Sequence, residues 1–199
     1  MFDYGKRTYI MGILNVTPDS FSDGGDFNNL DIAIQHAKDM VDQGADIIDL
    51  GGESTRPGHS YVDSDEELRR VIPVIKKLKQ ELDIPISIDT YKADVAEEAL
   101  KLGVTMVNDV WGLRKDKNMA SVIGKYDAEV CIMHNQDGTN YDKDIMESIK
   151  DFFKVSIEMA MSCGVKKEKI VLDPGVGFGK DFEQNIEVLR RLNELKDLG

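Results

Sequence analysis

The sequence predicts an α/β fold built from parallel βα units, and two observations carry that prediction. First, six short runs rich in Ile and Val occur along the 199 residues, and each is followed by a stretch with helical periodicity. Second, a polar residue stands at or just past the end of each run, where parallel strands present their carboxyl ends to a ligand. Six such alternations indicate strands joined by right-handed helical crossovers. The predicted strands are residues 8–15, 46–52, 85–90, 104–110, 129–134 and 170–175.

The segments between the predicted strands have the spacing of amphipathic helices. In the first, residues 30–44, Gly44 suits the C-cap position. In the second, residues 65–82, Pro73 is expected to bend or interrupt the helix. The apolar side predicted for the first helix consists of Ile32, Ala33, His36, Ala37, Met40 and Val41. The remaining helical stretches are residues 92–103, 119–127, 145–164 and 185–195.

The composition limits the classes of partner. A formal net charge of -12 and a pI near 4.7 argue against nucleic acid and anionic membranes, which bind basic surfaces. The early Asp3 and a short apolar run argue against a signal peptide, and no stretch approaches a membrane span. Cys131 and Cys163 lack metal-type spacing, so we expect reduced thiols in a cytoplasmic protein. Since there is no linker, we expect one domain over residues 1–199.

The pattern of strands and helices alone leaves two architectures open. A doubly wound sheet is the default for six βα units, yet no GxGxxG follows the first strand and no GxxxxGK[ST] occurs. The glycine-rich stretch at 175–180 follows the sixth strand, which makes it a weak nucleotide loop. A (β/α)8 barrel normally needs about 250 residues, so this chain is short by about two βα units.

Five motifs, each just after a predicted strand, resemble dihydropteroate synthase. They are GILNVTPDSFSDGG, DLGGESTRPG, SIDT, VNDVWG and LDPGVGFGK, in that order. The resemblance runs from about Tyr9 to the end of the chain. It implies a (β/α)8 TIM barrel with six of its eight βα units encoded here. It also implies the family's reaction: 6-hydroxymethyl-7,8-dihydropterin pyrophosphate condenses with p-aminobenzoate, giving dihydropteroate and pyrophosphate in folate biosynthesis.

The resemblance assigns three residues to the pterin. Asp173 accepts the adjacent N–H donors of the pterin edge, a task that suits a carboxylate. Asn108 bonds elsewhere on the ring. Asp89 is the third contact and is placed to stabilise positive charge as pyrophosphate leaves; no residue is assigned as acid or base. The alternative for Asp89 and Asp173 is a strand-end cap for the next helix.

Two loops are assigned to the other substrate groups. Thr55 and Arg56 offer a hydroxyl and a fixed positive fork to the pyrophosphate. Pro57 stiffens the same loop, which in the family also meets p-aminobenzoate. Phe21, in a loop that resembles a lid, offers an aromatic face to the p-aminobenzoate ring. The resemblance implies that sulfonamides compete for this place. The alternative for residues 52–58 is a polar surface turn.

Asn15 is the residue that the resemblance links to a metal. Its amide oxygen is expected to help hold Mg²⁺, which bridges to the departing pyrophosphate. Mg²⁺ prefers oxygen ligands and keeps several waters, so one asparagine plus substrate phosphate is a normal arrangement. The metal and local positive groups would allow an acidic protein to handle an anion.

Two rival functions and several roles stay open. A folate-dependent methyltransferase pterin-binding domain shares the strand-end acids and amides but needs no pyrophosphate loop. A non-catalytic pterin-binding fragment is the other rival, since the family's later Ser-Arg-Lys and Arg-x-His strands are not in this sequence. We therefore expect little turnover from these residues alone, and a homodimer from the intact enzyme. The roles of His134, Asp49 and Lys180 stay open; a residue lining the mouth is favoured for His134, and an anion contact or a helix cap for Lys180.

Overall fold

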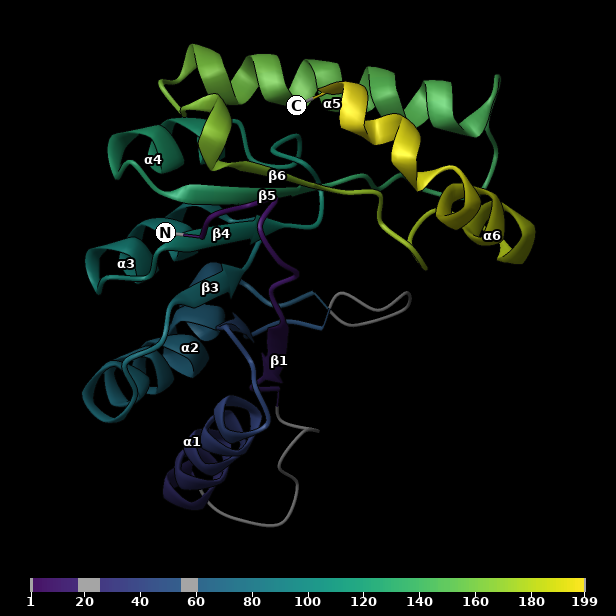
Figure 1. The fold of residues 1–199 in the computed structure, drawn as a ribbon. Coiled ribbons are helices and arrows are strands. Elements are labelled where there is room, and N and C mark those ends of the chain that lie inside the picture. The colour runs from purple at the N-terminus through teal and green to yellow at the C-terminus, as the bar shows by residue number, and fades with distance from the viewer. Residues whose placement is uncertain (1, 18–25, 55–60, 199) are drawn as a thin grey trace. The chain divides into compact units, whose positions relative to one another are not determined.

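The computed structural model describes residues 2–17, 26–54 and 61–198, and Figure 1 shows its strands and helices. Six strands alternate with six α-helices along this part of the chain, as the sequence predicts. The strands are β1 Met11–Asn15, β2 Ile47–Gly51, β3 Ile86–Asp89, β4 Met106–Asp109, β5 Glu129–Met133 and β6 Ile170–Asp173. The α-helices are α1 Asp26–Asp42, α2 Ser64–Glu81, α3 Ala93–Lys101, α4 Met119–Lys125, α5 Ile145–Ser162 and α6 Phe182–Arg190. Two 3-10 helices are η2 Lys167–Lys169 and η3 Leu192–Leu198.

The strand order decides between the two architectures that the sequence left open. The strands are hydrogen-bonded in the order β1-β2-β3-β4-β5-β6, which is their order along the chain. A doubly wound sheet contains a point where this order reverses, whereas each strand of a (β/α)8 barrel follows its predecessor. The structure is therefore an α/β fold with the sequential parallel strands of a barrel. Among the helices in the described ranges, none is both long and apolar enough to cross a membrane.

The chain divides into two compact units. The first comprises residues 1–89 and 98–106, and the second comprises residues 90–97 and 107–199. A single domain over residues 1–199 stays a prediction.

The first unit is built on the parallel strands β1, β2 and β3, with α1 and α2 packed beside each other. All five residues of β2 are buried, as is typical of a parallel strand covered on both faces. Gly12 lets α1 approach β1 closely, because a Cβ there would lie 2.9 Å from the sulfur of Met40. The hydrophobic core of this unit lies between the strands and these helices.

The predicted helices agree with the structure in part. Helix α2 continues through Pro73 without interruption, and a bend at this residue stays a prediction. On α1 the buried side chains include Ala33, Ile34 and Ala37, whereas Ile32 is 46% exposed. Gly44 ends the first helical segment as predicted, with a positive φ of 103° and its N–H donating to the oxygen of Val41.

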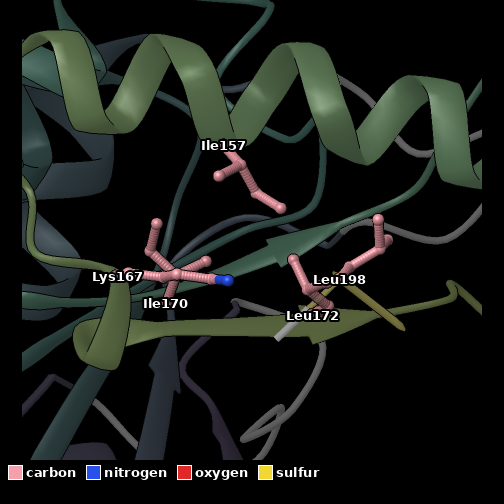
Figure 2. A pocket seen from close by; sticks show the side chains of 5 residues that line it. All are labelled: Ile157, Lys167, Ile170, Leu172 and Leu198. Carbon is pink, nitrogen blue, oxygen red and sulfur yellow. The ribbon is translucent and has the colours of Figure 1, made fainter. Parts of the chain in front are cut away.

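The second unit contains the parallel pair β5 and β6, with α4, α6 and η3 each contacting α5. A small pocket lies between α5, η2, β6 and η3 (Figure 2). Ile170 and Leu172 of β6 line this pocket, so Val171 and Asp173 lie on the other face of the strand because side chains alternate. The lining residues are Ile157, Lys167, Ile170, Leu172 and Leu198, and none is a predicted site residue.

Candidate functional site

In the first unit, the strand register brings two predicted site residues to the same level. Asn15 ends β1 and pairs with Gly51, and Gly51 pairs with Asp89, which ends β3. A Cβ on Gly51 would lie 2.9 Å from Oδ1 of Asn15 and 3.5 Å from Oδ2 of Asp89. The amide oxygen of Asn15 and the carboxylate of Asp89 therefore both lie close to Gly51, and a side chain at this position would crowd Asn15.

The segment that follows β2 is tied to α2. The Arg70 guanidinium donates to the backbone oxygen of Gly52 at 2.8 Å. The buried Glu53 carboxylate accepts a hydrogen bond from the Val62 N–H at 3.2 Å. A Cβ on Gly52 would lie 2.7 Å from Val71, so only glycine fits this approach to the helix. Both ends of the loop 53–62 are thus held in place.

Four predicted site residues lie outside the described residues. They are Phe21 in the first loop and Thr55, Arg56 and Pro57 in the second. Their assignment to p-aminobenzoate and pyrophosphate stays a prediction.

In the second unit, Asn108 belongs to a turn that a buried carboxylate organises. The next residue, Asp109, is fully buried and accepts hydrogen bonds from the N–H groups of Trp111 at 2.8 Å and Leu113 at 2.9 Å. Leu113 has a φ of 68°, a left-handed conformation that costs roughly 1–2 kcal/mol in a residue with a side chain. Burial raises the pKa of Asp109 to about 6, against the lowering effect of the two backbone donors. Asp109 therefore holds the chain directly after Asn108.

Asp173 ends β6, and its carboxylate is oriented by the chain that follows. Its Oδ1 accepts a hydrogen bond from the Gly175 N–H at 2.8 Å. Within the part of the chain that the structure describes, no other hydrogen bond reaches this carboxylate, so Oδ2 is available to a ligand. This bond closes a turn and does not cap a helix, since Asp181 caps α6, and it uses only one of the two oxygens.

His134 and Lys180 form a buried pair, which settles two roles that the sequence left open. His134 is 2% exposed, so it does not line an open mouth as the sequence analysis favoured. Its Nδ1 lies 3.0 Å from Nζ of Lys180, which is 7% exposed. Burial, reinforced by the charges of Lys180 and Arg114, lowers the pKa of His134 to about 3, so the imidazole is neutral at pH 7. Burial also lowers the pKa of Lys180 to about 8, opposed by the charge of Asp173.

The described residues contain no cluster of three or more His, Cys, Asp or Glu side chains that would hold a metal ion unaided. Oxygen donors do stand together at Asn15 and Asp89, over Gly51. Amide and carboxylate oxygens are the ligands that Mg²⁺ accepts, and its remaining positions are commonly filled by water and substrate phosphate. The amide oxygen of Asn15 therefore fits Mg²⁺ held jointly with water and a phosphorylated substrate.

Sequence reasoning named the residues at the strand ends but missed those that support them. Asp109 lies inside the motif VNDVWG, directly after Asn108. An acidic residue within an apolar run was the feature of the sequence that could have indicated a buried carboxylate. Gly51 was likewise inside a motif and was not singled out. The contact between Lys180 and His134 had no signal in sequence, because 46 residues separate them.

Comparison with known proteins agrees with the fold and the motifs. The sequence model of the family "Pterin binding enzyme" matches residues 11–199. A dihydropteroate synthase of Clostridium beijerinckii is 57% identical over 100% of this chain and 73% of that protein. The Bacillus subtilis dihydropteroate synthase is 49% identical over 98% of this chain and 68% of its own length.

Solved structures give the same result. The Xanthomonas albilineans dihydropteroate synthase with 4-aminobenzoic acid has a TM-score of 0.92 and 40% identity, covering 98% of this chain and 71% of that one. The Yersinia pestis dihydropteroate synthase in complex with a sulfonamide drug has a TM-score of 0.87 and 46% identity. The match covers 95% of this chain and 70% of that one.

The sequential parallel strands and the family match together make this chain a pterin-binding enzyme. Its relatives define the class more narrowly, since the proteins at 57% and 49% identity are both dihydropteroate synthases. The chain belongs to the dihydropteroate synthase family, whose members are transferases that join a dihydropterin to p-aminobenzoate with loss of pyrophosphate.

Proposed function

We propose that this chain contributes the pterin site for the family's reaction, in which Asp173 and Asn108 bind the pterin and Asp89 stabilises the developing positive charge. The low turnover expected of these residues alone stays a prediction. The observation that carries the proposal is the state of the Asp173 carboxylate. Gly175 fixes Oδ1 by a 2.8 Å hydrogen bond, while Oδ2 accepts no hydrogen bond from the described residues. A carboxylate oriented in this way can accept N–H donors from the amide and amino edge of a pterin without first breaking a contact.

Asp89 suits its role because it ends β3 and its carboxylate lies beside Gly51, at the level of Asn15. As pyrophosphate leaves, the pterin methylene carbon gains positive charge, and a nearby fixed carboxylate stabilises that charge. The amine nitrogen of p-aminobenzoate then forms the new C–N bond and loses a proton. No residue of the chain needs to form a covalent intermediate in this scheme.

Asn15 is proposed to hold Mg²⁺ together with the substrate pyrophosphate. When bound, the ion supplies positive charge that neutralises the leaving pyrophosphate. Asn15 itself contributes an amide oxygen at the end of β1, on the same side of the strands as Asp89. Thr55 and Arg56 are proposed as further pyrophosphate contacts, and Phe21 and Pro57 as contacts of p-aminobenzoate.

The relatives favour the synthase over the methyltransferase. They do not bear on the non-catalytic fragment, because this chain spans 73% and 68% of the two relatives described above. The proteins at 47–57% identity are named dihydropteroate synthase, and none of those reported is a methyltransferase. The Yersinia pestis relative binds a sulfonamide drug, which supports the proposal that sulfonamides compete for the p-aminobenzoate place here.

We also propose a homodimer in the cytoplasm, without nucleic-acid or membrane partners. The net charge of -12 supports the absence of nucleic acid, and two free cysteines suit a reducing compartment. The proposal of a dimer rests on the family resemblance, and sedimentation equilibrium measures it directly.

The test of the central proposal is Asp173→Asn. The substitution replaces one acceptor oxygen with a donor that faces the pterin donors, so we expect pterin binding to weaken by about tenfold or more. Titration calorimetry with 6-hydroxymethyl-7,8-dihydropterin measures the effect. Asp181→Asn is the matched control, since Asp181 caps α6 and asparagine caps equally well. Equal pterin affinity of Asp173→Asn and the parent chain would show that the assignment is wrong.

A further inference from the structure

Lys180 is a buried charged residue that the proposed reaction does not use. Its ammonium has three hydrogens, and the chain provides three acceptors for them. Nζ lies 3.0 Å from the backbone oxygen of Gly175, 3.0 Å from the backbone oxygen of Phe178 and 3.0 Å from Nδ1 of His134. All donors are therefore engaged within the protein, so this lysine is not built to bind a substrate anion.

The third acceptor requires a particular form of His134. Nδ1 accepts from the ammonium only when the ring is neutral and its proton is on Nε2. Burial and the neighbouring positive charges keep the pKa of this imidazole near 3, so the neutral form is the one present at pH 7. The ring is also held by aromatic contact with Phe152, at 4.8 Å between centroids in an edge-to-face arrangement. His134 is therefore a fixed acceptor.

One residue, Gly175, connects Lys180 to the Asp173 carboxylate. Gly175 gives its oxygen to Lys180 and its N–H to Oδ1 of Asp173. Gly175 has a φ of 69°, and a Cβ there would lie only 2.0 Å from the backbone oxygen of His134. His134 in turn donates its N–H to the backbone oxygen of Asp173 at 2.9 Å. Asp173 is thus held on both sides by residues that Lys180 contacts.

We propose that Lys180 is a positioning residue for the pterin site, which fixes the peptide of Gly175 and thereby the direction of the Asp173 carboxylate. The inference rests on the proposed role of Asp173 in pterin binding. Lys180 reaches no substrate itself. It holds the loop 174–180 through the backbone oxygens of Gly175 and Phe178. It also places a positive charge near the Asp173 carboxylate.

A second buried lysine at the other end of β6 provides a matched control. Lys169 directly precedes Ile170, is 5% exposed and pairs with the Asp127 carboxylate at 2.8 Å. Lys169→Met and Lys180→Met therefore remove the same buried charge from opposite ends of one strand. Only the second substitution lies on the side of Asp173.

The experiment is a double-mutant cycle between Lys180→Met and Asp173→Asn, read as the dissociation constant of 6-hydroxymethyl-7,8-dihydropterin. Ligand-observed NMR extends the range to millimolar constants for the weaker variants. We expect Lys180→Met to weaken binding about tenfold in the parent, and less than about twofold when Asp173 is already asparagine, because coupled residues are non-additive. Lys169→Met is expected to stay within about twofold of the parent.

Four results would count against the proposal. An equal loss from Lys180→Met in both backgrounds would show that the lysine acts independently of Asp173, and an equal loss from Lys169→Met would show a general effect of stability. If Asp173→Asn alone leaves binding unchanged, the proposed pterin role fails, and the fault then lies with Asp173 rather than with Lys180. Should Lys180→Met not fold, His134→Leu removes one of the three acceptors and keeps the lysine. At least about threefold weaker binding is then expected, and unchanged binding would overturn the proposal.

Discussion

Replacing Asp109 by asparagine should change how the stability of the protein depends on pH. Asp109 is fully buried, and its two oxygens accept the N–H groups of Trp111 and Leu113. The folded state raises the pKa of this carboxyl from 3.8 to about 6, chiefly because burial disfavours the charged form. Asparagine does not titrate, and its NH2 group faces one of the two backbone donors, so it lowers stability by the same amount at every pH. The difference in the pH dependence of the two proteins therefore reports the titration of Asp109.

The sign and size follow from the two pKa values. Between pH 4 and 6 the folded chain holds a proton on Asp109 that the unfolded chain has released. The free energy of unfolding therefore falls as pH rises through this window and is constant above it. A change from 3.8 to about 6 corresponds to about 3 kcal/mol, since one pKa unit equals about 1.4 kcal/mol.

Urea unfolding at several pH values between 4 and 7 measures the effect. The stability of the parent relative to Asp109→Asn should fall by about 3 kcal/mol over this range. Asp144→Asn is the control with the opposite sign, because the Arg191 guanidinium lowers the pKa of Asp144. Its contribution should be flat from pH 5 to 7 and fade only below about 4. Parallel pH curves for the parent and Asp109→Asn would refute the reasoning, since Asp109 would then titrate as it does in the unfolded chain.

Three further predictions concern glycines and the second substrate. Gly124→Ala should lower the free energy of unfolding by several kcal/mol in urea, because its Cβ would lie 1.9 Å from the backbone oxygen of Cys163. Gly164→Ala is the control, since it has open space around it but a φ of 89°, and it should cost only about 1–2 kcal/mol. Equal losses from the two substitutions would contradict the predicted clash at Gly124. Gly51→Ala should raise the KM for the pterin pyrophosphate about tenfold, since its Cβ would crowd Oδ1 of Asn15 at 2.9 Å. An unchanged KM in steady-state assays would show that substrate binding does not depend on the position of Asn15. Finally, p-aminobenzoate should bind only with pyrophosphate and Mg²⁺ present, and sulfonamides should displace it; calorimetry showing equal affinity without pyrophosphate would count against ordered binding.

The sequence by itself determined the order of strands and helices and the residues at the strand ends. Hydrophobic periodicity is a local property, so alternating runs of apolar residues predict each element without knowledge of its neighbours. The predicted strands, such as 129–134 and 170–175, differ from β5 and β6 by a few residues at their ends. The sequence placed Asn15, Asp89 and Asp173 at strand ends, because a polar residue at the end of an apolar run can be recognised without the fold.

Only the tertiary structure decided which supporting residues meet. Lys180 and His134 could not be assigned from sequence, because their contact depends on β6 lying beside β5 and on the path of the loop 174–180. The same holds for α1, where periodicity placed Ile32 on the apolar side, whereas packing against β1 and α2 buried Ile34 and left Ile32 exposed. Burial and partners at long range are properties of the packed chain, and they set the pKa of Asp109 and of Lys180 as no local pattern does.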